Sequence, residues 1–474
     1  MGTSSLPTYA SDSTHPDMSR RVVSRSSAPA GVGADEHGAS RAQGAERPSG
    51  GAKGREAARL GTSRTEFPPS AALPPHAEFR RQRFDRRNVS AAWLIEDARQ
   101  VAGAKEGQWV RPVRPARCGW ALGGAVGVHG SSVQPAHYSG TERCASIWAC
   151  PVCAAIVRAE RAREISAAVE RWQRRGGVVV FVTLTMRHKA SDSLNVSLDA
   201  ALQGWRYLLQ GSPWKKQRAR LGIAGYVRAV EVTWGAANGW HPHVHALLFL
   251  ENEPTSGDLL QLEHWLYERW ARGVVKHGGG LPSRLRGVDL RMADKDGKVL
   301  AQYLAKVQDE KKDRPSYDVG SELARSDWKT SRGGGNELRY MPFEFLDAPE
   351  GVPASVLWAE YVAATHGRRA ITWSRGLREL VELDPEKSDE DVIEDAEQSD
   401  LLFTIEADRW REVKRDSQLM AGILEAVELD RPDAAEHLAT GRYLLLDEWW
   451  IDVATGETIR PQRLHGGMSA AGLL

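Results

Sequence analysis

The chain has 474 residues, of which 41% are hydrophobic and 26% charged, a composition that suits a globular protein of several domains. It holds no run of about 18 apolar residues, so we expect no membrane span, and the polar N-terminus argues against a secretory signal. The net charge of +1 conceals a segregation, because residues 1–85, 86–345 and 346–474 carry +3, +12 and −14. We therefore expect a cytoplasmic protein whose basic middle faces a polyanion, unless the charges are only uneven solvated surface.

Residues 1–85 are rich in Ser, Ala, Gly, Pro and Arg and show no sustained apolar period. Such a stretch cannot bury enough surface to offset its ordering entropy, so it is predicted to be disordered. Its last part runs into "EFRRQRFDRR" (78–87), a basic lead-in that either touches a phosphate backbone or is merely solvated.

All four cysteines lie within residues 118–153. In a reducing compartment, clustering of this kind indicates metal before disulfide. Four thiolates can close a tetrahedral structural zinc site, and the CPVC pair is a strong local signal for one. The alternatives are buried free cysteines, or a site in which His137 replaces the more distant Cys118. The ligand candidates are Cys118, Cys144, Cys150 and Cys153.

The middle of the chain alternates helical and extended patterns. Arg and Glu opposite Ala, Ile and Val predict a helix over 153–175, ended by two glycines. Runs rich in β-branched residues predict strands. The predicted strands cover 178–186, 223–234, 241–250 and 287–293, and further helices cover 198–210, 259–272 and 298–310.

The segment after residue 350 is different in character. Residues 383–400 form an acidic, linker-like stretch, and 442–459 are predicted to form a hairpin that closes a small C-terminal unit. We expect four regions: a disordered basic region (1–85), the cysteine cluster with its basic helix (86–165), a catalytic domain (166–345) and an acidic domain of unknown role (350–474).

The stretch "GWHPHVHALLFL" (239–250) places histidines at every second position, so His241, His243 and His245 share one face of a strand. Most such pairs are surface or satisfied core histidines. Here, however, the apolar run that follows anchors the strand, which suits ligands of a metal.

The preceding strand carries Glu231, and the register of the hairpin decides where its carboxylate lies. A five-residue loop centred on Ala237 pairs Glu231 with His243, which places two imidazoles and a carboxylate on one face. The favoured two-residue turn at Asn238–Gly239 would instead pair Glu231 with Ala246, on the other face. We prefer the wider loop, because a Glu between valines needs a partner.

On the predicted helix 298–310, Tyr303 and Lys306 lie three residues apart and share a face. Tyr303 also belongs to an apolar stripe, so a core position is the competing interpretation.

The ordered set "FVTLTMRH" (181–188), "HPHVHALL" (241–248) and "YLAKV" (303–307), preceded by "CASIWACPVC" (144–153), resembles the HUH endonucleases. Within them it is most similar to the rolling-circle replication initiators of actinobacterial plasmids. The resemblance covers roughly residues 117–345. It implies an α+β fold in which an antiparallel, RRM-like palm is flanked by helices, with the cysteine zinc site as an added subdomain.

In this family a histidine pair binds a divalent ion, usually Mg²⁺ or Mn²⁺, and a tyrosine attacks DNA. Carried over, His243 and His245 become metal ligands, Tyr303 the nucleophile and Lys306 its neighbour at the phosphate. Glu231 is the candidate third ligand, and His241 a further one. The implied reaction nicks one strand of the plasmid origin, leaves a 5′-phosphotyrosine and a 3′-OH primer, and later rejoins the strand.

The implied partners are single- and double-stranded origin DNA together with a host helicase and polymerase, in a bacterial cytoplasm. Some relatives carry a Glu four residues before the tyrosine that ends replication, but here that position is Val299. The candidate DNA contacts are Arg158, Arg161 and Arg163 beside the cysteines, and Thr183, Thr185 and His188 in the first motif. The cysteine cluster either recognises the duplex origin or only staples the domain.

Three other functions are compatible with these residues. A transposase or relaxase would share the histidine–tyrosine chemistry. A zinc-containing DNA-binding regulator would form no covalent product. A hydrolytic metalloenzyme acting on small substrates is disfavoured by the basic middle and the cysteine cluster.

Overall fold

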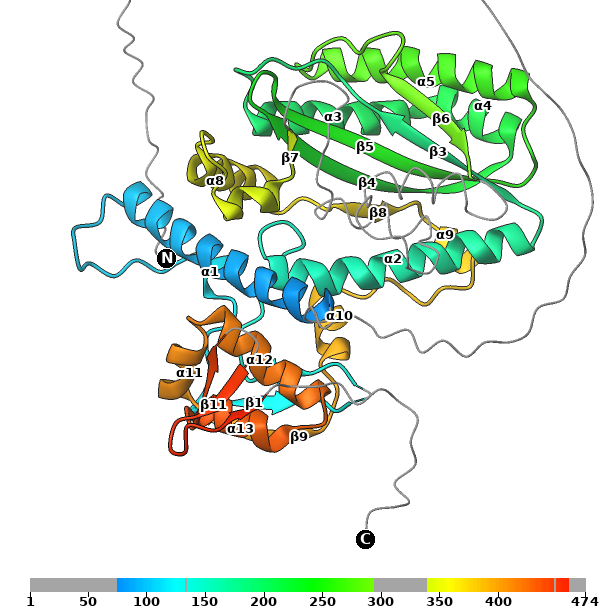
Figure 1. The fold of residues 1–474 in the computed structure, drawn as a ribbon. Helices are drawn as coiled ribbons and strands as arrows, with labels where there is room; N and C mark the ends of the chain where they lie inside the picture. Colours follow the sequence, from blue (N-terminus) through cyan, green and yellow to red (C-terminus); the bar gives the residue numbers. More distant parts are fainter. Residues whose placement is uncertain (1–74, 133, 294–338, 447–448, 460–474) are drawn as a thin grey trace, which may run out of the picture. The chain divides into compact units, whose positions relative to one another are not determined.

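A computed structural model describes residues 75–132, 134–293, 339–446 and 449–459 (Figure 1). The described residues belong to one compact unit. None of its described helices has both the length and the apolar character needed to cross a membrane.

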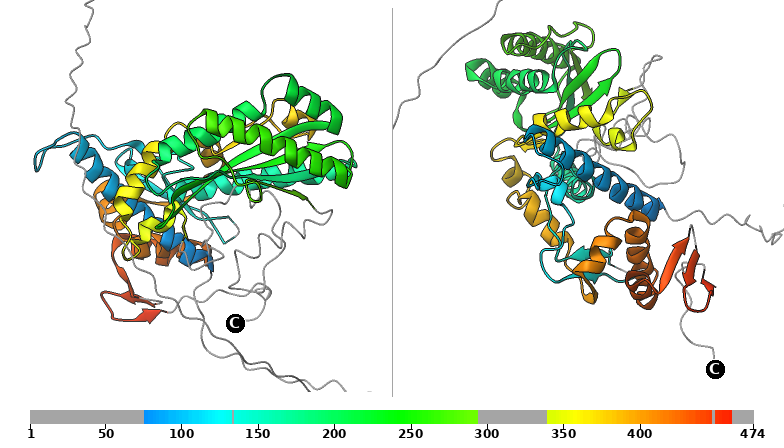
Figure 2. Two further views of the ribbon diagram at one scale, coloured as in Figure 1. Left: turned by 90° about the horizontal axis from the view of Figure 1, so that it is seen from above. Right: turned by 90° about the vertical axis from the view of Figure 1, so that its left-hand side faces the viewer.

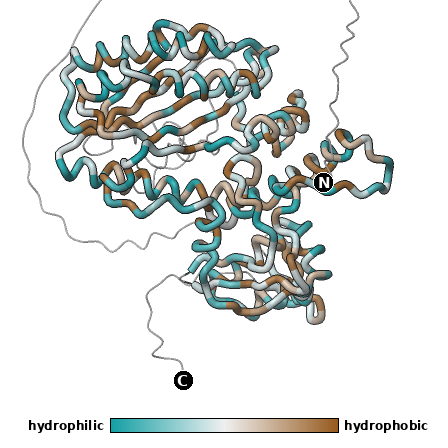
Figure 3. The backbone as a smooth tube through the Cα atoms, turned by 180° about the vertical axis from the view of Figure 1, so that it is seen from behind, coloured by the Kyte–Doolittle hydropathy of each residue, from teal (hydrophilic) through white to brown (hydrophobic). Residues whose placement is uncertain are grey.

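The centre of the fold is a six-stranded sheet in the order β6–β3–β5–β4–β7, in which β8 also pairs with β4. Every pairing in it is antiparallel, which confirms the expected α+β palm. Its strands are largely apolar in the hydropathy colouring of Figure 3. The strands are β3 (Val178–Leu184), β4 (Ile223–Gly235), β5 (Gly239–Leu250), β6 (Val288–Met292), β7 (Arg339–Tyr340) and β8 (Ile371–Trp373).

Helices cover both faces of this sheet (Figures 1 and 2). Even-numbered residues of β5, such as Val244 and Leu248, pack against α3 and α5 in one core cluster. Odd-numbered residues, such as Leu247 and Phe249, belong to a second cluster that includes α2. The helices are α2 (Pro151–Arg174), α3 (Leu194–Leu208), α4 (Gly211–Leu221) and α5 (Ser256–Lys276).

The segment after residue 341 returns to the palm, which corrects the domain boundary that we expect at 350. The 3₁₀ helix η2 (Pro342–Asp347) and α8 (Ala354–Thr365) bury Phe345 and Trp358 in the same core cluster as α2. β8 then pairs with β4 at the edge of the sheet. Part of the acidic region therefore completes the palm.

Glu360 of α8 ties this returning segment to the histidine strand. Its carboxylate accepts hydrogen bonds from Trp240 Nε1 (2.8 Å) and from the backbone N–H of Leu194 (2.7 Å), at the start of α3. One side chain therefore satisfies an otherwise unpaired donor of a helix N-terminus and fixes the residue before His241.

The linker-like stretch 383–400 is ordered in the structure, contrary to expectation. Ser388 and Asp391 form a capping box at the start of α10 (Asp389–Ala396), and α10 packs on α2. The short helix α9 (Leu377–Leu380) precedes it. Acidic residues that resemble a linker in the sequence instead neutralise arginines of α2.

A second, three-stranded sheet joins distant parts of the chain in the order β2–β1–β9. Its strands are β1 (Ala125–His129), β2 (His137–Ser139) and β9 (Leu401–Glu406). It shares a core with α11 (Ala407–Val413), α12 (Ser417–Glu428) and α13 (Pro432–Thr440). The hairpin expected at 442–459 is confirmed as β10 (Tyr443–Leu446) and β11 (Trp449–Asp452), extended by β12 (Thr458–Ile459).

Helix α1 (Pro75–Val101) begins ten residues before the expected end of the disordered region. Phe84 is buried in the core of the C-terminal helices, and Arg80 pairs with Glu428 at 2.6 Å. Arg86, which is buried, pairs with Asp347. The basic segment 78–87 is thus held by partners more than 250 residues away in the sequence. No local sequence pattern indicates these partners.

Candidate active site

The β4–β5 hairpin adopts the wider of the two registers considered above. Gly235 pairs with Gly239, Thr233 with His241 and Glu231 with His243. This register excludes the alternative with a two-residue turn at Asn238–Gly239. Gly239 has φ +73°, a conformation that glycine adopts without strain. The register brings Glu231 onto the face of the histidines.

Ligand atoms of Glu231, His243 and His245 all lie within 4.8 Å of one another. In the structure, His245 Nε2 and Glu231 Oε2 are 2.8 Å apart, and both residues are buried. Two imidazoles and one carboxylate leave coordination positions open for water or substrate. The donor set of two imidazoles and one carboxylate therefore fits a divalent cation.

Two neighbours hold the ring of His245. Thr183, its partner across β3–β5, places Oγ1 3.3 Å from Nδ1, so Nδ1–H can donate to the hydroxyl and leave Nε2 for a metal. Phe181 stacks on the other side, with ring centroids 5.5 Å apart. Packing thus fixes the orientation of this imidazole.

His241 lies beside the three candidate ligands. Its Nε2 is 3.1 Å from that of His243, and its ring is 4.3 Å from the ring of His188. Burial lowers the pKa of His241 strongly and that of His243 to about 4, and neighbouring histidines add to both shifts. Both rings are therefore neutral at neutral pH, which is the form that binds metal.

Two other residues of the first motif, Thr185 and His188, form hydrogen bonds to the backbone of neighbouring loops. Thr185 Oγ1 donates to the carbonyl of Arg286 at 2.8 Å, and His188 Nδ1 donates to that of Asn238 at 2.7 Å, in the β4–β5 turn. Tyr303 and Lys306, with Val299, lie outside the described residues.

Two charged residues near the site escaped the sequence reasoning. Asp289 of β6 pairs with Thr183 and bonds Arg291 at 2.8 Å. Arg339 of β7 lies close enough for its charge to lower the pKa of His241 and of His243. Each sits on a short strand whose place in the sheet depends on pairing with distant residues, so no sequence signal marks them.

The four cysteines form one buried cluster, Cys118, Cys144, Cys150 and Cys153. Cys118 Sγ and Cys153 Sγ are 3.6 Å apart, and Cys144 Sγ and Cys153 Sγ 3.7 Å. A tetrahedron with Zn–S bonds of 2.3 Å has edges of about 3.8 Å, whereas a disulfide bond is about 2.05 Å long. The geometry fits zinc and excludes disulfides. His137 stacks on His129 instead, with centroids 4.9 Å apart.

The cysteine cluster joins several elements. The 3₁₀ helix η1 (Arg114–Arg117) precedes Cys118, and Cys150 caps α2 by accepting the N–H of Cys153 at 3.5 Å. Trp410 of α11 donates to the carbonyl of Gly119 at 2.9 Å. Arg87, Arg143 and Lys414 supply positive charge that offsets the net negative charge of a Zn(Cys)₄ centre.

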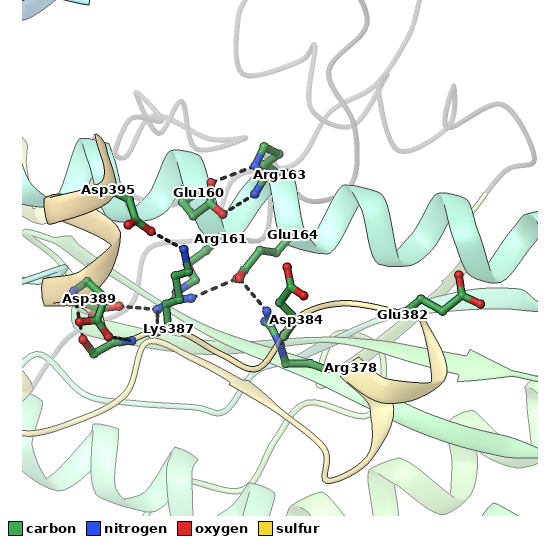
Figure 4. A network of polar contacts seen from close by, with 12 residues as sticks. Glu160, Arg161, Arg163, Glu164, Arg378, Glu382, Asp384, Lys387, Asp389 and Asp395 are labelled. Atoms are coloured by element: carbon green, nitrogen blue, oxygen red, sulfur yellow. Dashed lines mark hydrogen bonds and ion pairs between the residues drawn. The ribbon is translucent and has the colours of Figure 1, made fainter. Parts of the chain in front are cut away.

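The basic helix beside the cysteines is packed mainly against the protein itself (Figure 4). Arg158 donates to the carbonyl of Ile147 at 3.1 Å, and buried Arg161 binds Glu164 and Asp389 at 3.1 and 2.9 Å. Glu164 also accepts from Arg378 at 2.7 Å. Arg163, paired with Glu160, is the exposed member of the arginine trio and keeps its place as a candidate DNA contact.

Comparison with known proteins places the chain in a family. A family model described as "Replication protein" matches residues 138–274. "Protein rep" of Streptomyces lividans is 36% identical over 331 residues, which cover 57% of this chain and 69% of that relative. The chain belongs to this replication-protein family. The resemblance to rolling-circle initiators of actinobacterial plasmids is thereby confirmed.

The matched part of this replication protein contains Glu231, His243 and His245 and three of the four cysteines. A second relative, the "Neomycin resistance protein" of Streptomyces cyanogenus, is 38% identical over 136 residues, 23% of this chain and 31% of the relative. No solved structure matches this replication protein.

Proposed function

We propose that this replication protein starts plasmid rolling-circle replication by binding the origin and nicking one DNA strand with Tyr303. The observation that carries the proposal is the convergence of Glu231, His243 and His245 on one face of an antiparallel sheet. The family match and the relative named "Protein rep" favour an initiator over a transposase or relaxase.

The reaction exchanges one phosphoester for another. The phenol of Tyr303 gives up its proton and its oxygen bonds to phosphorus, while the bond from phosphorus to the 3′ oxygen breaks and that oxygen takes up a proton. Tyrosine has a pKa near ~10, so its oxyanion must be stabilised, a role for Lys306. A divalent cation such as Mg²⁺ or Mn²⁺, bound by Glu231, His243 and His245, would withdraw charge from a non-bridging phosphate oxygen.

The products suit replication. The 5′-phosphotyrosine conserves the energy of the broken bond, so the strand can be rejoined without ATP. The free 3′-OH primes a host polymerase, and a host helicase would open the duplex ahead of it. With Val299 in place of an acid, termination falls to another residue or to a second copy of the chain.

DNA contacts at this site are assigned to Arg163, Thr185 and His188, which lie at or near the protein surface. Thr183 acts on His245 rather than on DNA, and zinc in the cysteine cluster serves mainly to staple elements together. Phosphate contacts from such residues would position DNA without reading its sequence.

The test is the covalent adduct. Purified protein is mixed with a labelled single-stranded oligonucleotide library and Mn²⁺, and the products are separated under denaturing conditions. We expect wild type to form an adduct that Tyr303→Phe abolishes. Tyr317→Phe, which changes the next tyrosine along the chain and the alternative nucleophile, should retain it. A wild type that binds DNA without forming any adduct would be a non-catalytic regulator, and an adduct that persists in Tyr303→Phe would move the nucleophile elsewhere.

A further inference from the structure

Arg228 is a buried arginine in the middle of β4. Its side chain is 5% exposed, and it pairs across the sheet with Thr372 of β8 and Ala246 of β5. Nε donates to Thr372 Oγ1 at 3.0 Å and Nη2 to the carbonyl of Arg369 at 3.3 Å. Nη1 is buried and has no hydrogen-bond partner among the described residues.

Within the part of the chain that the structure describes, this guanidinium also lacks a counter-charge. Among the described residues, the ionisable groups that act on it are Tyr226 and Arg206, neither of which is an anion at neutral pH. Burial, with the charge of Arg206, lowers the pKa of Arg228 to about 10, so it stays protonated. Elsewhere in the fold, buried Arg86 and Arg161 each pair with an aspartate.

A buried charge without a partner is costly, so its retention points to a partner that comes from outside. Arg206 of α3 and Arg369 before β8 are exposed and add positive charge at the same edge of the sheet. Arg228 lies three residues from Glu231 on β4, so the two side chains project from opposite faces. The basic cluster is therefore separate from the candidate metal centre.

We propose that Arg228, Arg206 and Arg369 form a phosphate site that binds the DNA backbone at the edge of the sheet made by β8, away from the metal ligands. The exposed guanidinium groups of Arg206 and Arg369 would donate charge-assisted hydrogen bonds to phosphate oxygens, and the buried charge of Arg228 would strengthen the attraction. The contact falls on DNA that flanks the nick, because the scissile phosphate belongs to the candidate metal centre. The inference rests on the proposed function in that its ligand is DNA.

The test measures equilibrium binding of a fluorescent DNA hairpin with single-stranded arms, without added divalent metal, from 50 to 200 mM salt. Arg228→Met is expected to weaken binding about tenfold and to reduce the slope of log K against log salt by about 0.9, the value of one lost phosphate contact. Its melting temperature should equal or exceed that of wild type, since an uncompensated charge is removed. Arg411→Met, which removes an exposed arginine paired with Asp408, is the matched control and should bind as wild type.

The outcomes separate this inference from the proposed function. If wild type binds no DNA, both the proposed function and the phosphate site are contradicted. If Arg228→Met binds DNA with unchanged affinity and salt slope, only the phosphate site is contradicted. If that variant does not fold, Arg206→Gln with Arg369→Gln takes its place, and an unchanged slope again overturns the site. Inorganic phosphate that stabilises wild type but not Arg228→Met, with equal DNA binding by both, would identify free phosphate as the ligand instead of DNA.

Discussion

Glu231 is the single residue on which the candidate metal centre depends most. It is a buried acid between two valines, and its carboxylate bonds His245 at 2.8 Å. Burying a carboxylate is unfavourable unless it is paired or binds a metal. The two adjacent imidazoles alone would form a weaker site, because neither brings negative charge.

We expect Glu231→Gln to lower the affinity for Mn²⁺ by at least about 100-fold, because loss of an outer-sphere partner alone costs about 10- to 100-fold and Glu231 is itself a candidate ligand. The amide keeps the size of the side chain, so the change isolates the charge. Isothermal titration of Mn²⁺ into metal-free protein measures it.

Thr183→Val is expected to lower the affinity for Mn²⁺ less than Glu231→Gln does. It removes the hydroxyl 3.3 Å from His245 Nδ1 but no candidate ligand, so a loss nearer tenfold is expected. Equal affinities for wild type and Glu231→Gln would show that the carboxylate is not a ligand.

The position of a side chain can be predicted from the sequence where a local pattern determines it. It cannot be predicted where tertiary contacts determine it. The alternation of His241, His243 and His245 fixed their common face in advance. Arg158 and Arg161 looked like an exposed basic face in the sequence but are buried, because their partners lie at Ile147 and Asp389. Nothing in the spacing of the arginines reveals such partners.

Among the elements, the β4–β5 hairpin determines the site through its register. A shift of one residue would move every candidate ligand of one strand to the other face. The turn is packed closely: a Cβ on Gly239 would lie 2.9 Å from Ala190 Cα and 3.1 Å from its carbonyl oxygen. The loop after β3 therefore limits which turns can form.

We predict that Gly239→Ala destabilises the protein by roughly 3 kcal/mol, from a left-handed backbone plus the clash, and that it weakens Mn²⁺ binding. Chemical denaturation measures the free energy of unfolding.

Gly278→Ala is the control, because its φ of +84° is also left-handed while a Cβ there meets nothing within 4 Å. Its cost should be about 1 kcal/mol, with metal binding unchanged. Equal losses for the two variants would contradict a role of close packing in holding the turn.

Most elements that sequence reasoning found have long periodic patterns, namely β3, β4, β5, α2, α3 and α5, and it also found the shorter β6 and the β10–β11 hairpin. β8 has only three residues, too few to show alternation, so its place beside β4 was not predictable. α10 looked like a linker because acidic residues hide its short apolar face.

At the scale of the whole molecule, the cysteine cluster connects parts that are far apart in sequence. Gly119, next to Cys118, accepts from Trp410, and Arg87 of α1 donates to the carbonyl of Lys414 at 3.3 Å. The cluster therefore stabilises the junction of α1, α2 and the C-terminal helices. The clustering of cysteines in the sequence predicted a shared site but not which elements this site connects.

We predict that Cys144→Ser removes zinc, measured as one ion per chain in wild type by atomic absorption. Because binding energy of a structural zinc is folding energy, amide hydrogen exchange should rise in β1, β9 and α12. The palm strands β3, β4 and β5, which have their own core, should keep their protection.

His137→Ala tests the alternative ligand and should retain zinc with unchanged exchange. Loss of zinc in His137→Ala would contradict a four-cysteine site. Unchanged hydrogen exchange in Cys144→Ser would show that the metal does not stabilise the junction.

The pairing of β1 with β9 joins residues that are 272 to 281 positions apart. During synthesis, the β4–β5 hairpin leaves the ribosome and can fold with its neighbours long before β9 exists. Until β9 is synthesised, β1 and β2 form only a two-stranded pair, which is marginally stable in water. A nascent chain stalled or cut before residue 400 would thus carry a formed palm beside an unfinished N-terminal half, exposed to proteases.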